Sequence, residues 1–255
     1  MNKIVEKKYF CNKSVLNVSL NKDSVNSINN KMLDELVKVL HQVKSENTRC
    51  LIISTKGNNF CAGADLKERQ KLSKIETVDF LDKLNSFLKD LENLNIVTIA
   101  AIKGACLGGG LEIALACDFR VSSETGLFGF PETSLGIIPG AGGTQRMVKL
   151  FGVSTSMKWI FSADRYNADH ALNDRIIDYL VDLNKLDDFC VSLAKKIIKN
   201  SPVALKAAKK SILSGQFETS LNVEKEQYIK TLNSDDRDEG LLSFKEKRPP
   251  IWKNK

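Results

Sequence analysis

Apolar runs and helical periodicities alternate along the first two thirds of the chain. Residues 50–55 (CLIIST) and 96–102 (IVTIAAI) form continuous apolar runs, which are typical of parallel strands covered on both faces. Shorter strand signals lie at residues 15–20 and in the stretches FRVSS, GLFGF and RIIDYLV. Apolar positions recur at helical spacing in four segments: residues 30–44, 75–94, 109–117 and 154–162. The alternation predicts an α/β fold.

The strand signals stop after about residue 184. Ser201 followed by Pro202 is a typical helix start, because serine caps free backbone N–H groups and proline suits the first helical position. Further helices are predicted at about residues 216–232 and 236–247. We therefore expect an α/β core over residues 1–190 and a helical C-terminal region over residues 191–255.

Size and composition are those of a soluble globular protein. The chain has 255 residues, of which 42% are hydrophobic and 27% charged, so a substantial core is expected. No apolar run approaches the roughly 20 residues that a membrane span requires. The stretch MNKIVEKKYF lacks the apolar segment of a secretory signal. We expect no membrane association and a cytoplasmic location.

The cysteines and histidines show no pattern typical of metal or nucleophile chemistry. None of the six cysteines forms a CxxC pair or has histidines at metal-ligand spacing. This favours reduced thiols in a cytosol-like compartment over disulfides. His41 and His170 have no nucleophile signature nearby, and we interpret both as structural.

The net charge of +7 is concentrated in the C-terminal quarter, where 14 basic and 8 acidic residues lie between Lys195 and Lys255. Such a region suits nucleic acid, a membrane surface or a phosphorylated small molecule. Aromatic side chains that would stack on single-stranded nucleic acid are sparse there: Phe217, Tyr228, Phe244 and Trp252.

Three consecutive glycines open the predicted helix in the stretch GACLGGGLEIALACDF, residues 104–119. The run fits neither a Rossmann nor a P-loop pattern. It does leave backbone N–H groups unobstructed at a helix start, where they can hold an anion or an oxygen that becomes negative during a reaction. Close packing of glycine against a neighbouring strand is the alternative. A second turn of small residues, within GNNFCAGADLKE (57–68), also follows a predicted strand. The two turns could direct one N–H each at a shared carbonyl oxygen.

Two glutamates stand in apolar surroundings, Glu112 within the predicted buried helix and Glu132 directly after a proline. A buried carboxylate is costly unless it is paired, and its pKa usually rises. Two such groups suit coupled acid and base work, with one protonated and the other ionised. The alternative is that each glutamate pairs with an arginine, for instance Arg120 or Arg146.

Five stretches together resemble the enoyl-CoA hydratase/isomerase (crotonase) family, in order and spacing: FCAGADLKE, GACLGGGLEIALACDFRV, FPETSLGIIPGAGGTQR, SPVALKAAK and DEGLLSFKEKRPP. The resemblance implies a ClpP/crotonase-like spiral of ββα units with a C-terminal helical region that packs homotrimers, often as dimers of trimers. Within the family, CAGADLKER and EGLLSFKEKRPP are most similar to hydratases resembling methylglutaconyl-CoA hydratase.

The resemblance also assigns roles. It implies that the amides of Ala62 and Gly109 hold the thioester oxygen, and that Glu112 and Glu132 are catalytic. The coenzyme A loop matches Ala62, Gly63, Ala64, Asp65 and Leu66, and Phe244 and Lys247 match residues that bind coenzyme A in relatives, sometimes across a subunit interface. No metal or redox cofactor is expected, because coenzyme A is part of the substrate.

The expected activity is hydration of a 2-enoyl-CoA thioester, an acyl-CoA substrate. Glu112 would deprotonate the water and Glu132 would give a proton to the α-carbon. Alternatives are a methylglutaconyl-CoA hydratase of leucine breakdown and a 3-enoyl-CoA isomerase. The stretch LNKDSVNSIN lacks the proline common in relatives, which affects the shape of a loop near the coenzyme A site.

Nucleic-acid binding is the alternative from another class, because some relatives bind RNA. The candidate surface is the helix predicted at residues 30–44, whose lysines are interrupted by Asp34 and Glu35. We therefore expect no nucleic-acid partner.

Overall fold

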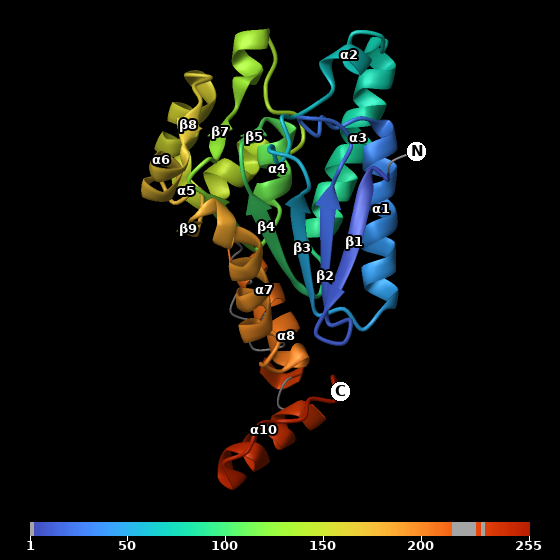
Figure 1. Ribbon diagram of the computed structural model, residues 1–255, viewed down its shortest axis with the longest axis vertical. Helices are drawn as coiled ribbons and strands as arrows, with labels where there is room; N and C mark the ends of the chain where they lie inside the picture. The colour runs from blue at the N-terminus through green and yellow to red at the C-terminus, as the bar shows by residue number, and fades with distance from the viewer. Residues whose placement is uncertain (1–2, 216–227, 231–232) are drawn as a thin grey trace.

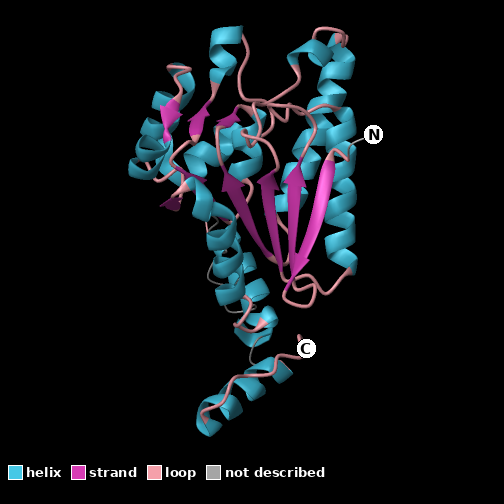
Figure 2. Cartoon of the chain, viewed as in Figure 1, coloured by secondary structure: helices cyan, strands magenta, loops and turns pink. Residues whose placement is uncertain are grey.

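The computed structural model describes residues 3–215, 228–230 and 233–255, apart from the side chains at 244 and 245. A six-stranded sheet lies at its centre, in the order β1-β2-β3-β4-β6-β9 (Figure 2). β1 pairs antiparallel with β2, and every other pair in this sheet is parallel. The strands are β1 (Val5–Phe10), β2 (Val15–Leu20), β3 (Cys50–Thr55), β4 (Val97–Ile102), β6 (Phe119–Ser123) and β9 (Tyr179–Val181).

A second, three-stranded sheet has the order β5-β7-β8. Its strands are β5 (Ala105–Leu107), β7 (Leu127–Gly129) and β8 (Tyr166–Asn167), and a parallel bridge between Cys61 and Cys106 extends it by one position. Successive turns of the chain therefore give one strand to the large sheet and one segment to the small sheet before entering a helix. This is a spiral of ββα units, as the family resemblance implies.

Helices cover both faces of the large sheet. The core-side helices are α1 (Asn30–Ser45), α3 (Lys74–Glu92), α4 (Gly109–Leu115) and α5 (Gly143–Phe161), with the short α2 (Leu66–Arg69), η1 (Pro131–Leu135) and α6 (Ala168–Asn173) between them. α3 starts with a capping box between Ser73 and Glu76, and it buries one face through Phe80, Leu84, Phe87, Leu88 and Leu91. All seven residues of α4 are buried, so this helix forms the centre of the core.

The C-terminal helices lie apart from the strand ends that carry the glycine-rich turns. After η2 (Leu183–Lys185), α7 (Leu186–Ile197) packs on the other face of the sheet through Leu186, Cys190 and Ala194. The predicted boundary at residue 190 therefore falls within a helix that belongs to the core. α8 (Pro202–Ser214) and α10 (Asp235–Glu246) follow, and α10 lies at the opposite end of the molecule from α2 (Figure 1). Ser201 donates a hydrogen bond to Asp236 at 2.9 Å, which ties α10 to the start of α8.

The predicted strands and most helices agree with the structure. Residues 50–55 are β3 as predicted, and α1 and α3 match within two residues at each end. The helix predicted at residues 154–162 corresponds to the second half of α5. The first half is not predicted, because the glycines at 142 and 143 indicate a turn rather than a helix start. Gly152, with φ of 81°, kinks this helix. The first strand and the short β5 and β8 are not apparent from the sequence, since they lack an apolar run. Most of the helix predicted at 216–232 lies outside the described residues.

None of the helices in the described parts of the chain combines the length and apolar character needed to cross a membrane.

Candidate active site

Three segments from consecutive turns of the spiral meet at one end of the small sheet. Cys61 pairs with Cys106, and Leu107 pairs with Gly129, all in parallel. Three neighbouring segments of the chain therefore end their pairing at the same edge of the small sheet. They continue into residues 62–65, into Gly108 and into the turn that carries Glu132. Parallel pairing keeps these segments in register although they are far apart in the sequence.

Two backbone amides from the first two of these segments lie close together. A methyl group built on Gly109 would lie 3.8 Å from the nitrogen of Ala64, and one built on Gly63 would lie 3.5 Å from the nitrogen of Gly109. Within the described residues, neither the Ala64 nor the Gly109 N–H donates to a protein acceptor. Two adjacent unpaired donors can hold one oxygen atom between them.

The first amide is that of Ala64 and not that of Ala62. The Ala62 N–H already donates to the carbonyl oxygen of Val25 at 2.9 Å, and the Asp65 N–H donates to that of Ile28 at 2.9 Å. The Gly63 N–H bonds to the Cys61 thiol. The prediction for Ala62 is therefore wrong, and Ala64 supplies the N–H that this turn leaves for a ligand.

Glu112 is held from behind by a glycine-rich loop. Its side chain is buried, and Oε1 accepts hydrogen bonds from the N–H groups of Ala141 at 2.8 Å and Gly143 at 2.7 Å. Burial raises the pKa of Glu112, while these two amides and the charge of Arg146 act in the opposite direction. One carboxylate oxygen is thus fixed by the protein, so the orientation of the other is fixed too.

Glu132 stands on η1, one turn of the spiral further on, and lies against the glycine-rich turn. Its Oε1 would be only 2.5 Å from a methyl group on Gly108. Its Oε2 is buried and has no hydrogen-bond partner among the described residues. Burial, together with the nearby charge of Glu112, raises the pKa of Glu132 to about 7. A buried oxygen without a protein partner, in a group that carries a proton near neutral pH, is suited to proton transfer to a ligand.

Neither glutamate is neutralised by an arginine, which removes the alternative that the sequence left open. Arg120 forms an ion pair with Asp178 at 2.9 Å. Arg146 pairs with Glu92 at 3.0 Å, and it also donates to the carbonyl oxygen of Ala141.

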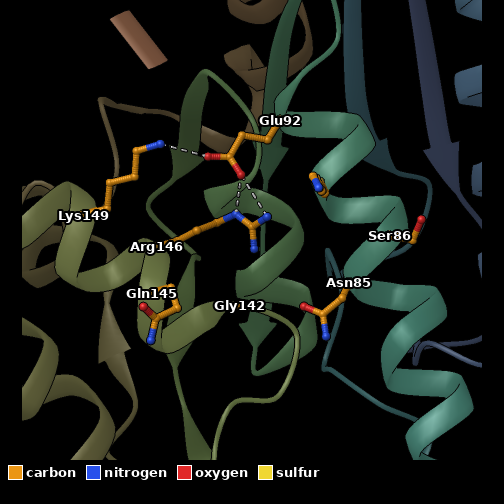
Figure 3. A pocket seen from close by; sticks show the side chains of 8 residues that line it. Asn85, Ser86, Glu92, Gly142, Gln145, Arg146 and Lys149 are labelled. Atoms are coloured by element: carbon orange, nitrogen blue, oxygen red, sulfur yellow. Dashed lines mark hydrogen bonds and ion pairs between the residues drawn. The ribbon is translucent and has the colours of Figure 1, made fainter. Parts of the chain in front are cut away.

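Lys149 reaches the same Glu92 from the next turn of α5, so Glu92 lies between two cations (Figure 3). These side chains line a cavity of about 530 Å³ between α3 and α5. The cavity lies behind the loop that holds Glu112, and neither Glu112 nor Glu132 lines it.

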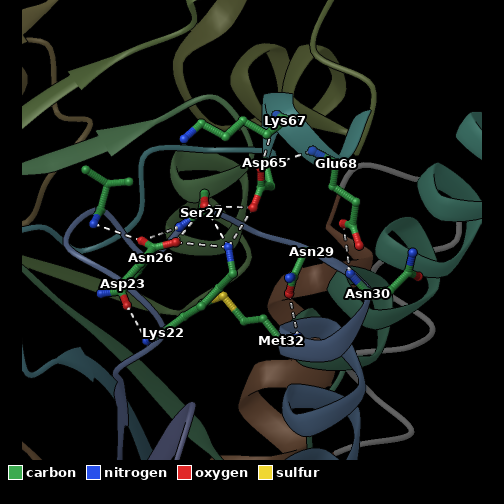
Figure 4. A network of polar contacts seen from close by, with 11 residues as sticks. Lys22, Asp23, Asn26, Ser27, Asn29, Asn30, Met32, Asp65, Lys67 and Glu68 are labelled. Carbon is green, nitrogen blue, oxygen red and sulfur yellow. Dashed lines mark hydrogen bonds and ion pairs between the residues drawn. The ribbon is translucent and has the colours of Figure 1, made fainter. Parts of the chain in front are cut away.

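The loop predicted to bind coenzyme A is held by a network around Lys22 (Figure 4). Its ammonium group donates to Asp65 at 2.8 Å, Asp23 at 3.0 Å and Ser27 at 2.8 Å. Asp65 also caps α2 by accepting from the N–H groups of residues 67 and 68. Leu66 is 52% exposed and has no role in this network. These hydrogen bonds hold the loop next to the Ala64 amide.

The C-terminal residues expected to bind coenzyme A are not at this site in the same chain. Lys247 is exposed and follows α10, which lies beyond the opposite end of the sheet (Figure 1). The side chain of Phe244, on α10, lies outside the described residues. Within the described residues, no group of three His, Cys, Asp or Glu side chains could hold a metal ion.

Comparisons with known proteins agree on one family. The model of the enoyl-CoA hydratase/isomerase family matches residues 11–255. The chain is similar to a probable mitochondrial enoyl-CoA hydratase 2 of Arabidopsis thaliana, with 42% identity over 89% of this chain and 77% of that protein. It is also similar to the mitochondrial methylglutaconyl-CoA hydratase of Homo sapiens, with 41% identity over 89% of this chain and 70% of that one. The crystal structure of an enoyl-CoA hydratase from Bacillus anthracis has 38% identity and a TM-score of 0.96, and the match covers 99% of this chain and 100% of that one.

Proposed function

The chain belongs to the enoyl-CoA hydratase/isomerase family and has its crotonase fold, and we propose that it adds water across the 2,3 double bond of a 2-enoyl-CoA thioester. The observation that supports this most is the arrangement of two raised-pKa glutamates beside two unpaired amides. The names of the similar proteins as enoyl-CoA and methylglutaconyl-CoA hydratases agree with it.

The amides of Ala64 and Gly109 would hold the thioester oxygen. As water adds to the β-carbon, negative charge develops on this oxygen, and two fixed N–H donors stabilise it without reorganisation. Removal of one such donor typically costs about 10²–10³ in rate.

The two glutamates would share the proton transfers. Glu112, in its ionised form, takes a proton from water while the water oxygen bonds to the β-carbon. Glu132, in its protonated form, gives its proton to the α-carbon. After the reaction Glu112 carries a proton and Glu132 does not, so one proton must pass between them, directly or through solvent, before the next cycle. Because the two carboxyls interact, they titrate as a pair. The proposed reaction requires no metal or redox cofactor.

Substitution of each glutamate tests this proposal. We expect Glu112→Gln and Glu132→Gln each to lower kcat for crotonyl-CoA by about 10²–10⁴-fold, the usual contribution of a positioned acid or base. Binding of the thioester should change little. The double variant should lose little more than either single one, because the two groups act as a unit. Glu124→Gln, at an exposed carboxylate, is the control. Near-normal turnover in either single variant would rule out the two-carboxylate mechanism, and activity on 3-enoyl thioesters alone would favour an isomerase.

A homotrimer, or a dimer of trimers, is part of the same proposal. The second half of α5 and the segment after η1 expose large apolar side chains, among them Ile138 (67% exposed) and Phe161 (71% exposed). Exposed apolar faces of this kind are typical of protein interfaces. Since α10 lies far from the site of its own chain, we propose that Phe244 and Lys247 act at a neighbouring subunit. Light scattering of the wild type and Phe161→Glu tests the assembly, and a wild-type monomer would contradict it.

A cytoplasmic location is also proposed. The support is that all six cysteines are free thiols, as expected in a reducing compartment. Cell fractionation with an antibody to the protein tests the location, and recovery in an oxidising compartment would contradict it.

A further inference from the structure

The Ala64 N–H is oriented by a hydrogen bond at the other end of its own peptide unit. That unit joins Gly63 to Ala64, and its carbonyl oxygen accepts from the N–H of Ile28 at 2.8 Å. Because a trans peptide unit is planar, its C=O and N–H groups point in opposite directions. The bond from Ile28 therefore directs the Ala64 N–H away from the segment at residues 25–28. Ile28 also pairs with Ala64 in a parallel bridge and accepts from the N–H of Asp65 at 2.9 Å.

The segment that carries Ile28 turns at Asn26. Val25 and Ile28 both bond to the turn at residues 62–65, Val25 through its carbonyl oxygen to the N–H of Ala62. In an extended chain the groups on one side recur at every second residue, whereas Val25 and Ile28 are an odd number of residues apart. The backbone must therefore turn between them, and Asn26 has a φ of 50° in the left-handed region. Asparagine adopts this region more readily than most residues with a side chain.

The side-chain amide of Asn26 holds this turn in place. The residue is 1% exposed, and both N–H groups of its amide are bonded, to Oγ1 of Thr55 at 2.7 Å and to the carbonyl oxygen of Asn59 at 2.9 Å. Its Oδ1 accepts from the backbone N–H of Lys22 at 2.9 Å (Figure 4). Thr55 is the last residue of β3, so the amide joins the segment to the large sheet. Buried amide groups that lose their partners are costly, so these bonds fix the segment firmly.

We propose that Asn26 is a positioning residue for the contact with the thioester oxygen. Because it is buried, it acts through the segment at residues 25–28, whose Ile28 N–H orients the Ala64 N–H. A donor that is fixed beforehand stabilises developing charge without reorganisation, and a tilted donor does not. Asn26 should therefore affect the chemical step more than the binding of coenzyme A. This inference rests on the proposed hydratase function and adds a residue on which its oxygen contact depends.

Asn26→Gly tests this positioning. Glycine keeps the left-handed backbone conformation, so the variant removes the side-chain hydrogen bonds without backbone strain. We expect kcat for crotonyl-CoA to fall by about 10²-fold, the usual effect of a misplaced contact at a reacting group. Thr55→Val removes one acceptor of the Asn26 amide and should lower kcat about tenfold. This second variant keeps the proposal testable if Asn26→Gly does not fold.

The carbonyl stretching frequency of a bound thioester is the measurement that a merely structural role would not change. Hydrogen bonds from fixed donors polarise the C=O bond and lower this frequency. Butyryl-CoA has no double bond to hydrate, so its ¹³C-labelled carbonyl can be observed in the complex by isotope-edited infrared spectroscopy. We expect a shift to lower frequency in the wild type and a smaller shift in both variants. Free coenzyme A has no thioester carbonyl, and its Kd should change by less than about threefold.

The matched control is Asn29→Ala. Asn29 lies in the same loop between β2 and α1, and its side chain caps α1 by accepting from the N–H of Met32 at 2.9 Å. Its loss should lower stability but change neither kcat nor the carbonyl frequency.

Two results would overturn the role of Asn26 and leave the hydratase function standing. One is an unchanged carbonyl frequency in Asn26→Gly and Thr55→Val. The other is a fall in the affinity for free coenzyme A as large as the fall in kcat, which would show that Asn26 serves the loop as a whole. A wild type that hydrates no 2-enoyl thioester would instead contradict the proposed function.

Discussion

Glu132 lies against Gly108, because a methyl group placed on Gly108 would be only 2.5 Å from Oε1 of the Glu132 carboxyl group. Gly108 also has a φ of 49°, which side-chain-bearing residues rarely adopt. The absence of a side chain at this position therefore allows both the backbone turn and the approach of the second glutamate.

Gly108→Ala should accordingly affect activity through Glu132. The added methyl group meets the end of a flexible side chain, so we expect Glu132 to move and kcat to fall by about 10²-fold or more. The positive φ should in addition cost about 1–2 kcal/mol of unfolding free energy. Steady-state kinetics and denaturant unfolding measure the two effects. Gly57→Ala, where a methyl group would meet nothing within 4 Å, is the control. Unchanged kcat in a folded Gly108→Ala protein would contradict the assigned role of Glu132.

The loop behind Glu112 is fixed by α3. Arg146 donates to the carbonyl oxygen of Ala141 at 2.9 Å and is itself held by Glu92, while Asn85 donates to the carbonyl oxygen of Gly140 at 2.9 Å. Two N–H groups of this loop, those of Ala141 and Gly143, donate hydrogen bonds to Glu112. Glu92 thus acts on Glu112 through Arg146 and the loop.

We expect Glu92→Gln to loosen this loop and lower kcat by about tenfold, the effect of one charge-assisted hydrogen bond. The amides hold the pKa of Glu112 down against burial, so their loss should raise it. A base with a raised pKa is ionised only at higher pH, and the acidic limb of the rate profile should move upward. The other charges near Glu112 are Arg146, Arg69 and Glu132.

The control for Glu92 is Asp90→Asn. It removes the same charge from the same turn of α3, but its partner is Lys44 on α1, at 3.0 Å on the surface. A merely structural role of Glu92 would lower stability without moving the pH profile. The profiles of the two variants should therefore differ, and identical profiles would show that Glu92 does not position Glu112.

Glu132 should make the folded protein less stable at alkaline pH. Its pKa is about 7 in the folded state against 4.5 for an ordinary glutamate, so the folded state binds this proton more tightly. That contribution to stability is fully present below about pH 4.5 and is lost as pH rises through 7. With allowance for partial exposure, Glu132→Gln should stabilise the protein by about 2 kcal/mol more at pH 8 than at pH 5. Urea unfolding at the two pH values measures this, and a pH-independent difference would contradict the raised pKa.

Lys22 should matter for substrate binding more than for the chemical step. Its ammonium group joins Asp65 to Asp23 and Ser27, and Lys22→Met leaves these acids without a cation. We expect KM for crotonyl-CoA to rise about tenfold, equivalent to about 1.4 kcal/mol, with kcat changed little. Lys56→Met, at an exposed ion pair with Glu6, should change neither. A fall in kcat with constant KM would indicate instead that Lys22 contributes to the chemical step.

Some parts of this protein can be predicted from local pattern. The buried strands β3 and β4, the helices α1 and α3 and the start of α8 have apolar spacing and caps that depend on near neighbours only. The family resemblance likewise identifies Glu112 and Glu132 by position. β5 and β8 could not be predicted, because strands of two or three residues are specified by their partners and not by their own sequence.

The sequence by itself determined the α/β core, the small residues at the two turns and the two acids in apolar surroundings. Only the tertiary structure decided which N–H of this turn has no acceptor among the described residues, because Ala62 donates to Val25 and Asp65 donates to Ile28, which leaves the N–H of Ala64. It also decided that Arg146 forms its ion pair with Glu92 and not with Glu112 or Glu132. The physical reason is that hydrogen bonds and ion pairs form between residues far apart in the chain. A sequence pattern shows which donors, acceptors and charges a residue carries, but not which partner each of them binds.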